Sequence, residues 1–184
     1  SNMATISNLS IDQGTTFSTS VTVKSTAAST KLTAALTSSA TTATVASTVE
    51  FPENGTLTVE NEKITYTGKT TTTFTGLTRG ASSTTAVAHA DQTIVSFDSA
   101  ALNLTGYSTL AQLRKSYDST TATAFTSSLT SATDGIIALS LTAAQTAALS
   151  SGRYQWDLTI TSGSSTVTRV VEGIAIINPS VSRS

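Results

Sequence analysis

His89 is the only histidine in the chain, so any acid–base or nucleophilic chemistry that needs an imidazole depends on it. A serine hydrolase would pair this ring with a serine and with an acid that orients it. Serine is so abundant here that its presence carries no information, and no Gly-x-Ser-x-Gly elbow occurs. We therefore expect His89 to be a surface or turn residue held by local hydrogen bonds.

Two pairs of carboxylates could serve glycoside cleavage, which uses two acids at the scissile bond. Glu60 and Glu62 fall in a predicted hairpin loop, and Glu50 and Glu53 flank a Phe-Pro pair. A glycosidase acid needs apolar burial to raise its pKa, and loop positions do not provide it. We predict that all four are exposed loop charges.

Metal and cofactor chemistry finds little support in the sequence. The chain has no cysteine, which excludes disulfides and thiolate sites, and a single histidine excludes a site with two imidazoles. The oxygen-rich stretches 118–121 and 131–134 lack the spaced acids of a calcium loop, and no glycine-rich phosphate loop occurs. We expect a protein that is not an enzyme and that holds no cofactor or metal.

The composition predicts a folded, threonine-rich β protein. The 184 residues include 40 threonines and 29 serines, while charged residues make up 11%, against about 25% in an average domain. A net charge of -1 argues against a basic face for nucleic acid, and no apolar run approaches the roughly 18 residues of a membrane span. Disorder favours high net charge and few β-branched residues, which is the opposite balance.

Alternation of apolar and polar residues predicts long strands in both halves of the chain. Thr142 and Gln145 match a capping box, which predicts a short helix over 143–149 that ends before Gly152. Around this helix, the pattern predicts strands at 15–24, 108–115, 124–129, 135–141, 154–160 and 167–177.

The spacing of Gly152, Tyr154 and Trp156 after the predicted helix is typical of a tyrosine corner. In immunoglobulin-like sandwiches a tyrosine lies two residues before a core position, and its hydroxyl bonds back to the preceding connection. Trp156 would occupy the position at which antibody domains have a cysteine. The alternative is that Tyr154 and Trp156 share one face of an ordinary amphipathic strand.

Residues 31–95 show a different sequence pattern, which predicts many short strands between closely spaced turns. We therefore predict an all-β chain in which an immunoglobulin-like β-sandwich, residues 4–29 plus 97–180, is interrupted by a small β domain at 30–96. Residues 1–2 are interpreted as the scar of an expression tag and are left out. The short strands are expected at 32–36, 42–46, 56–59, 63–67, 72–75 and 93–95, with a hairpin across 59–64.

Six stretches of the flanking segments stand out: residues 12–17, 104–107, 112–115, 139–145, 152–154 and 169–173. Together they resemble a family of tailed-bacteriophage structural proteins, namely the immunoglobulin-like N-terminal domain of phage upper baseplate proteins and related virion proteins. The intervening module resembles a small β domain that recurs in phage virion proteins, at residues 44–47, 51–52, 64–68, 74–80 and 88–90. The resemblance implies a structural role in the virion, in the tail, baseplate or neck, and it carries over no catalytic residue.

Partners implied by this resemblance are other virion proteins and further copies of the chain. Leu110, Arg114 and Tyr107 are the candidate interface residues, because Leu110 falls on the outward face of its predicted strand. The alternative function is an adhesion module that binds a host-surface glycan through the inserted domain.

Two groups of side chains, three arginines and three tyrosines, have an alternative structural interpretation. Arg114, Arg153 and Arg169 could instead form a solvated face with Asp157 or Glu172. Tyr107, Tyr117 and Tyr66 are expected to pack in the core or at its rim rather than to stack on sugars.

Overall fold

The computed structural model describes residues 4–181, so the predicted tag scar at residues 1–2 lies outside the described residues. The chain is all-β apart from one short helix in this described part. It divides into two compact units. We call Lys24–Asn103 the inserted unit, and the residues up to Val23 together with those from Leu104 the sandwich unit. The inserted unit is longer at both ends than the predicted 30–96.

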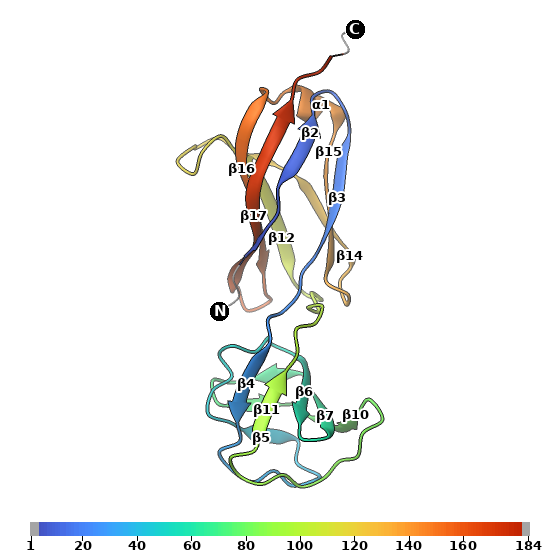
Figure 1. The fold of residues 1–184 in the computed structure, drawn as a ribbon, viewed down its shortest axis with the longest axis vertical. Helices are drawn as coiled ribbons and strands as arrows, with labels where there is room; N and C mark the ends of the chain where they lie inside the picture. Colours follow the sequence, from blue (N-terminus) through green and yellow to red (C-terminus); the bar gives the residue numbers. More distant parts are fainter. Residues whose placement is uncertain (1–3, 182–184) are drawn as a thin grey trace. The chain divides into compact units, whose positions relative to one another are not determined.

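The sandwich unit contains two sheets (Figure 1). In the larger sheet the order is β1 (Thr5–Ile6), β17 (Val167–Asn178), β16 (Gly152–Thr161), β12 (Ser108–Arg114) and β13 (Thr123–Ala124), and β2 (Leu9–Asp12) also pairs with β17. The smaller sheet has the order β14 (Thr126–Ser131), β15 (Ile136–Leu141) and β3 (Phe17–Thr22). β1 and β2 run parallel to β17, whereas the other pairings are antiparallel.

The core of the sandwich unit follows directly from the period-two pattern. Alternate residues of β15 and β16 are buried, namely Ile137, Leu139, Leu141, Trp156, Leu158 and Ile160. Phe125 links the two sheets, because its ring lies 5.9 Å from that of Trp156 and 6.2 Å from that of Phe17 on β3. Inward-facing side chains from both sheets therefore form one shared core, as in other β-sandwiches.

The connection between β15 and β16 contains the helix α1 (Ala143–Ala147). The Thr142 hydroxyl accepts from the Gln145 amide, and the Gln145 side chain accepts from the Thr142 amide, so the capping box is present. The helix ends at Ala147, two residues earlier than predicted. Gly152 is therefore not its terminator but the first residue of β16, where a φ of 127° turns the chain into the strand.

The tyrosine corner is also present at the start of β16. Tyr154 is buried and its hydroxyl donates to the Ser150 carbonyl at 3.1 Å. Trp156 follows on the same buried face, and its indole donates to the Ser7 carbonyl at 2.8 Å. This corner and the sheet order of the unit are features of immunoglobulin-like sandwiches.

The inserted unit is built from two smaller sheets. The first has the order β10 (Thr78–Ala81), β7 (Glu62–Tyr66), β6 (Gly55–Val59), β11 (Ile94–Phe97) and β4 (Ala28–Lys31), and the second has the order β5 (Thr42–Thr44), β9 (Thr73–Thr75) and β8 (Gly68–Lys69). Their core is rich in aromatic rings: Phe74 lies 5.0 Å from Phe51 and 4.7 Å from Tyr66, while Phe51 lies 6.3 Å from Phe97.

The two ends of the inserted unit lie side by side. Lys24 and Ala101 form an antiparallel β-bridge, and the Ser25 amide donates to the Ala100 carbonyl at 2.9 Å. This is the geometry that lets a loop accept an inserted module, because the host strands need not separate.

The predicted strand at 32–36 is wrong. Leu32 and Leu36 are both buried, but each makes only an isolated bridge, and the regular strand lies earlier, at β4. Two apolar residues four positions apart fit one face of a strand, but here an irregular segment buries both, and they bridge to separate partners, Val45 and His89. The short strands β1, β2, β8 and β10 were not predicted.

Candidate functional site

Four ionisable side chains meet inside the inserted unit, three of them buried. The Glu62 carboxylate accepts two hydrogen bonds of 2.9 Å from the Arg79 guanidinium. His89 lies between two acids, with Nδ1 2.6 Å from a Glu60 oxygen and Nε2 2.6 Å from a Glu62 oxygen. The Arg79 guanidinium also donates to the Thr37 and Val87 carbonyls. We call Glu60, Glu62, Arg79 and His89 the buried ionic cluster.

The predictions that His89 is a surface or turn residue and that Glu62 is an exposed loop charge are wrong. His89 is 2% exposed and Glu62 is 1% exposed, whereas the Glu60 side chain is 58% exposed. The loop of the β6–β7 hairpin is only two residues long, because Val59 pairs directly with Glu62. Glu62 is thus the first inward-facing residue of β7, on the same face of the strand as the buried Ile64.

Hydrogen bonding determines the charge states in this cluster. Burial by itself raises the pKa of Glu62, but hydrogen bonds from Arg79, His89 and two backbone amides outweigh it and lower the pKa to about 2. The ionised Glu62 carboxylate only accepts, so Nε2 of His89 donates to it, whereas the donor between Nδ1 of His89 and Glu60 depends on the tautomer of the ring. The Glu62 carboxylate is therefore held between the Arg79 guanidinium and the His89 ring.

A catalytic base needs a free nitrogen or oxygen, and the buried part of this cluster offers none. Both nitrogens of His89 are engaged, and the Glu62 oxygens accept five hydrogen bonds in total, two of them from the backbone amides of Gly80 and Val87. Among residues 4–181, no group of three or more His, Cys, Asp or Glu side chains could hold a metal ion. The cluster connects β7 and β10 to the irregular segments around Thr37 and His89.

The other acidic pair, Glu50 and Glu53, is exposed as predicted. Tyr66 packs in the core and its hydroxyl donates to the Pro52 carbonyl at 2.6 Å. Burial, with a smaller effect from Glu53, raises the pKa of Tyr66 above its ordinary value.

The outer face of the larger sandwich sheet carries charges in pairs. Arg169 reaches both Asp157, at 3.1 Å, and Glu172, at 3.3 Å. Leu110, which is 50% exposed, and Arg114 lie on this same face because both point opposite to the buried Ala111 and Leu113.

Of the two remaining surface tyrosines, only one lies with Leu110 and Arg114. Tyr117 shares a shallow pocket with them and is 71% exposed, so the expectation that it packs in the core or at its rim is wrong. Tyr107 is half-buried and lies outside this pocket. Of the three candidate interface residues, Leu110 and Arg114 share this pocket, and Tyr107 does not line it.

The outer face of the smaller sheet is different, because none of the residues of β3, β14 and β15 is charged. In the cross-strand register Ser20 and Ser128 flank Ala138, and Ser18 and Thr126 flank Ser140. We call the outward residues of these three strands the hydroxyl face: Ser18, Ser20, Thr22, Thr126, Ser128, Thr130, Ile136, Ala138 and Ser140. The alternating serines and threonines at 18–22 and 126–130 are the sequence signal for it.

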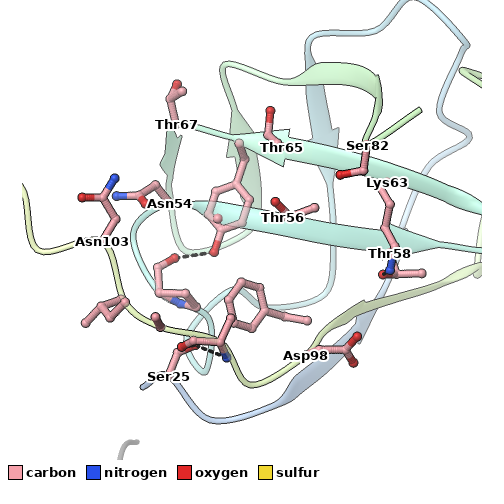
Figure 2. Close-up of a pocket in the computed structure, with 17 residues that line it drawn as sticks. Ser25, Asn54, Thr56, Thr58, Lys63, Thr65, Thr67, Ser82, Asp98 and Asn103 are labelled. Carbon is pink, nitrogen blue, oxygen red and sulfur yellow. Dashed lines mark hydrogen bonds between the residues drawn. The ribbon is translucent and has the colours of Figure 1, made fainter. Parts of the chain in front are cut away.

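The inserted unit also has an open pocket of about 740 Å³ (Figure 2). Its walls are the outward side chains of the β6–β7 hairpin and the segment 98–103 that returns from β11. Figure 2 shows Thr58 and Lys63 at one end, and Asn54 and Thr67 at the other.

Comparison with known proteins adds no assignment: no protein-family model matches the chain, and no curated protein matches it. In residues 4–181 the structure contains no helix with the length and apolar character needed to cross a membrane.

Proposed function

We propose that the chain is a non-enzymatic structural protein of a phage virion, in the tail, baseplate or neck, and that it acts by packing against neighbouring protein subunits. The hydroxyl face is the observation that carries this proposal. The resemblance of the flanking segments to phage virion proteins supports the assignment to the particle, and the all-β sandwich is compatible with it.

A protein surface usually holds charged groups, which must lose their water when a partner covers them. The hydroxyl face holds only serine, threonine, alanine and isoleucine side chains. Covering such a face removes no ion from water, and small side chains allow another flat surface to approach closely. The outer face of the larger sheet is less suited, since docking there would desolvate Arg169 and its two acids.

The edge of the smaller sheet supports the same conclusion. In the described part of the chain β3 pairs with β15 alone, which leaves its other edge unpaired. Natural proteins protect such edges with lysine, proline or a bulge, yet β3 contains no lysine or proline. A strand of a neighbouring subunit could pair there through its backbone.

The proposal is tested by following the chain through a lysate of the cells that produce it naturally. Antibodies raised against the purified protein should detect it at the density of DNA-containing particles in an equilibrium gradient, in a fixed ratio to the major capsid protein. The proposal is overturned if the chain stays with free proteins and is absent from the particles.

A matched pair of variants tests the role of the hydroxyl face. Ser20→Lys combined with Ser128→Lys places two charges beside Ala138, whereas Ser164→Lys places one in an exposed turn. We expect the first variant to reduce incorporation into particles and the second to leave it unchanged.

A further inference from the structure

We propose that the open pocket of the inserted unit is a binding site for a neutral saccharide. The proposal goes beyond the assembly function and is independent of it, because it rests on other residues in the other unit. It begins from the hydrogen-bonding groups that line the pocket (Figure 2).

The pocket presents many polar groups that the protein itself does not use. Within residues 4–181, the side chains of Asn54, Thr56, Thr65, Thr67 and Ser82 make no hydrogen bond to the protein, although all five line the pocket. Hydroxyl and amide groups both donate and accept, which is what a polyhydroxylated ligand requires. Thr56 and Thr65 are direct cross-strand partners, so their side chains lie next to each other on the same face of the hairpin.

The charge in the pocket is balanced. Lys63 and Asp98 are the charged residues that line it, and they have opposite signs. The ammonium group of Lys63 is already engaged, since it donates to the Thr58 hydroxyl at 2.6 Å. A phosphate, sulfate or carboxylate would therefore find no free cluster of cations, and a neutral ligand fits the site better.

The floor of the pocket is apolar and formed by core residues. The rings of Tyr66 and Phe97 reach the pocket from the core, and both residues are more than nine-tenths buried. Gly55 makes this floor possible, because a Cβ there would lie 2.6 Å from Phe97 Cε2. A sugar combines C–H patches with hydroxyls, so it matches an apolar floor with polar walls.

The size of the pocket also favours a small ligand. Its volume of about 740 Å³ lies within the range of roughly 300–1,000 Å³ that small-molecule sites occupy. Such sites usually have mostly apolar walls, whereas the outward side chains of this hairpin are threonines and a lysine. These walls disfavour an apolar ligand, which would leave their hydroxyls without partners.

The test uses the full chain on an array of immobilised neutral oligosaccharides of glucose, galactose, mannose and N-acetylglucosamine, with sialylated and sulfated glycans alongside. A neutral glycan that binds is then titrated in solution. Thr56→Val combined with Thr65→Val removes two adjacent hydroxyls while keeping shape and strand preference. Thr42→Val, on the exposed surface of β5 outside the pocket, is the control.

We expect a neutral saccharide to bind, the double variant to weaken binding about tenfold, and the control to bind like the wild type. The backbone amides of Thr56 and Thr65 should shift in the NMR spectrum of the wild type during the titration, which tests the site even if the double variant does not fold. The proposal is overturned if no neutral saccharide binds, if only anionic glycans bind, or if binding leaves these amides and the double variant unaffected.

Discussion

Arg79 and Glu62 face each other across neighbouring strands, β10 and β7, and join through two hydrogen bonds of equal length, 2.9 Å, in the interior of the inserted unit. This fork-to-fork arrangement is the strongest geometry available to such a pair. Because the guanidinium also binds carbonyls of two irregular segments, one ion pair organises parts of the chain that have little regular structure. Its removal should therefore affect the inserted unit as a whole.

Arg79→Met should destabilise the inserted unit by about 3–5 kcal/mol, because the Glu62 carboxylate would stay buried without its cation. Arg169→Met is the matched control, since the Arg169 side chain is 49% exposed, and its loss should cost less than about 1 kcal/mol. Urea unfolding monitored by amide hydrogen exchange separates the two units and gives both values. Equal effects of the two variants would contradict this account of the cluster.

The stability of the inserted unit should fall in acid. The pKa of Glu62 is lowered from 4.5 to about 2 in the folded protein, so the carboxylate stabilises the folded state fully above pH 4.5. This contribution, about 3 kcal/mol, is lost as the pH falls from 4.5 towards 2.

Unfolding free energies at pH 7, 4.5, 3 and 2 check this prediction. Glu62→Gln provides the comparison, because it lacks the titrating group and should lose less stability over the same interval. If the wild type and this variant show parallel pH profiles, the low pKa assigned to Glu62 is wrong.

Tyr154→Phe should destabilise the sandwich unit by about 1 kcal/mol, because the Ser150 carbonyl loses the hydroxyl of the tyrosine corner. Tyr117→Phe is the control, since Tyr117 is largely exposed and should tolerate the change. Thermal unfolding monitored by the fluorescence of Trp156, the only tryptophan, reports on this unit. A Tyr117 variant as unstable as the Tyr154 variant would argue against the corner.

Gly173→Ala should be among the most damaging single substitutions in the chain. A Cβ at this position would lie 1.9 Å from the Ser7 carbonyl oxygen, so the N-terminal segment would have to move away from β17. Gly163 has open space around its Cβ position, and Gly163→Ala should be nearly neutral. The denaturant midpoints of the two variants are compared with that of the wild type. A Gly173→Ala protein as stable as the wild type would contradict the close packing of the N-terminal segment against β17.

Local patterns were enough to predict the capping box, the tyrosine corner and the longer strands of the sandwich unit, but not its short strands β1 and β2. Each of the predicted features depends on residues a few positions apart: Thr142 with Gln145, and Tyr154 with the helix that precedes it. The division into a sandwich and an inserted unit was indicated by the change from long to short predicted strands near residue 30. The exact limits of the inserted unit were not predictable, because they depend on a bridge between Lys24 and Ala101, which lie far apart in the sequence.

The buried ionic cluster was not predictable in the same way. Glu62, Arg79 and His89 come from three separate segments, and only the fold brings them together. One local signal was available, since Glu62, Ile64 and Tyr66 alternate with outward-facing residues. A charged residue at an inward position of a strand suggests a buried partner, although it does not identify which one.

The hydroxyl face is the central element of the proposed assembly function, and a cryo-electron microscopy map of the intact particle tests it most directly. With this chain placed in the map, the account predicts that a neighbouring subunit covers Ser20, Ala138 and Ser128 while Arg169 and Asp157 remain in solvent. A map in which the face of the smaller sheet is bare, and the chain is held through the charged face instead, would contradict it.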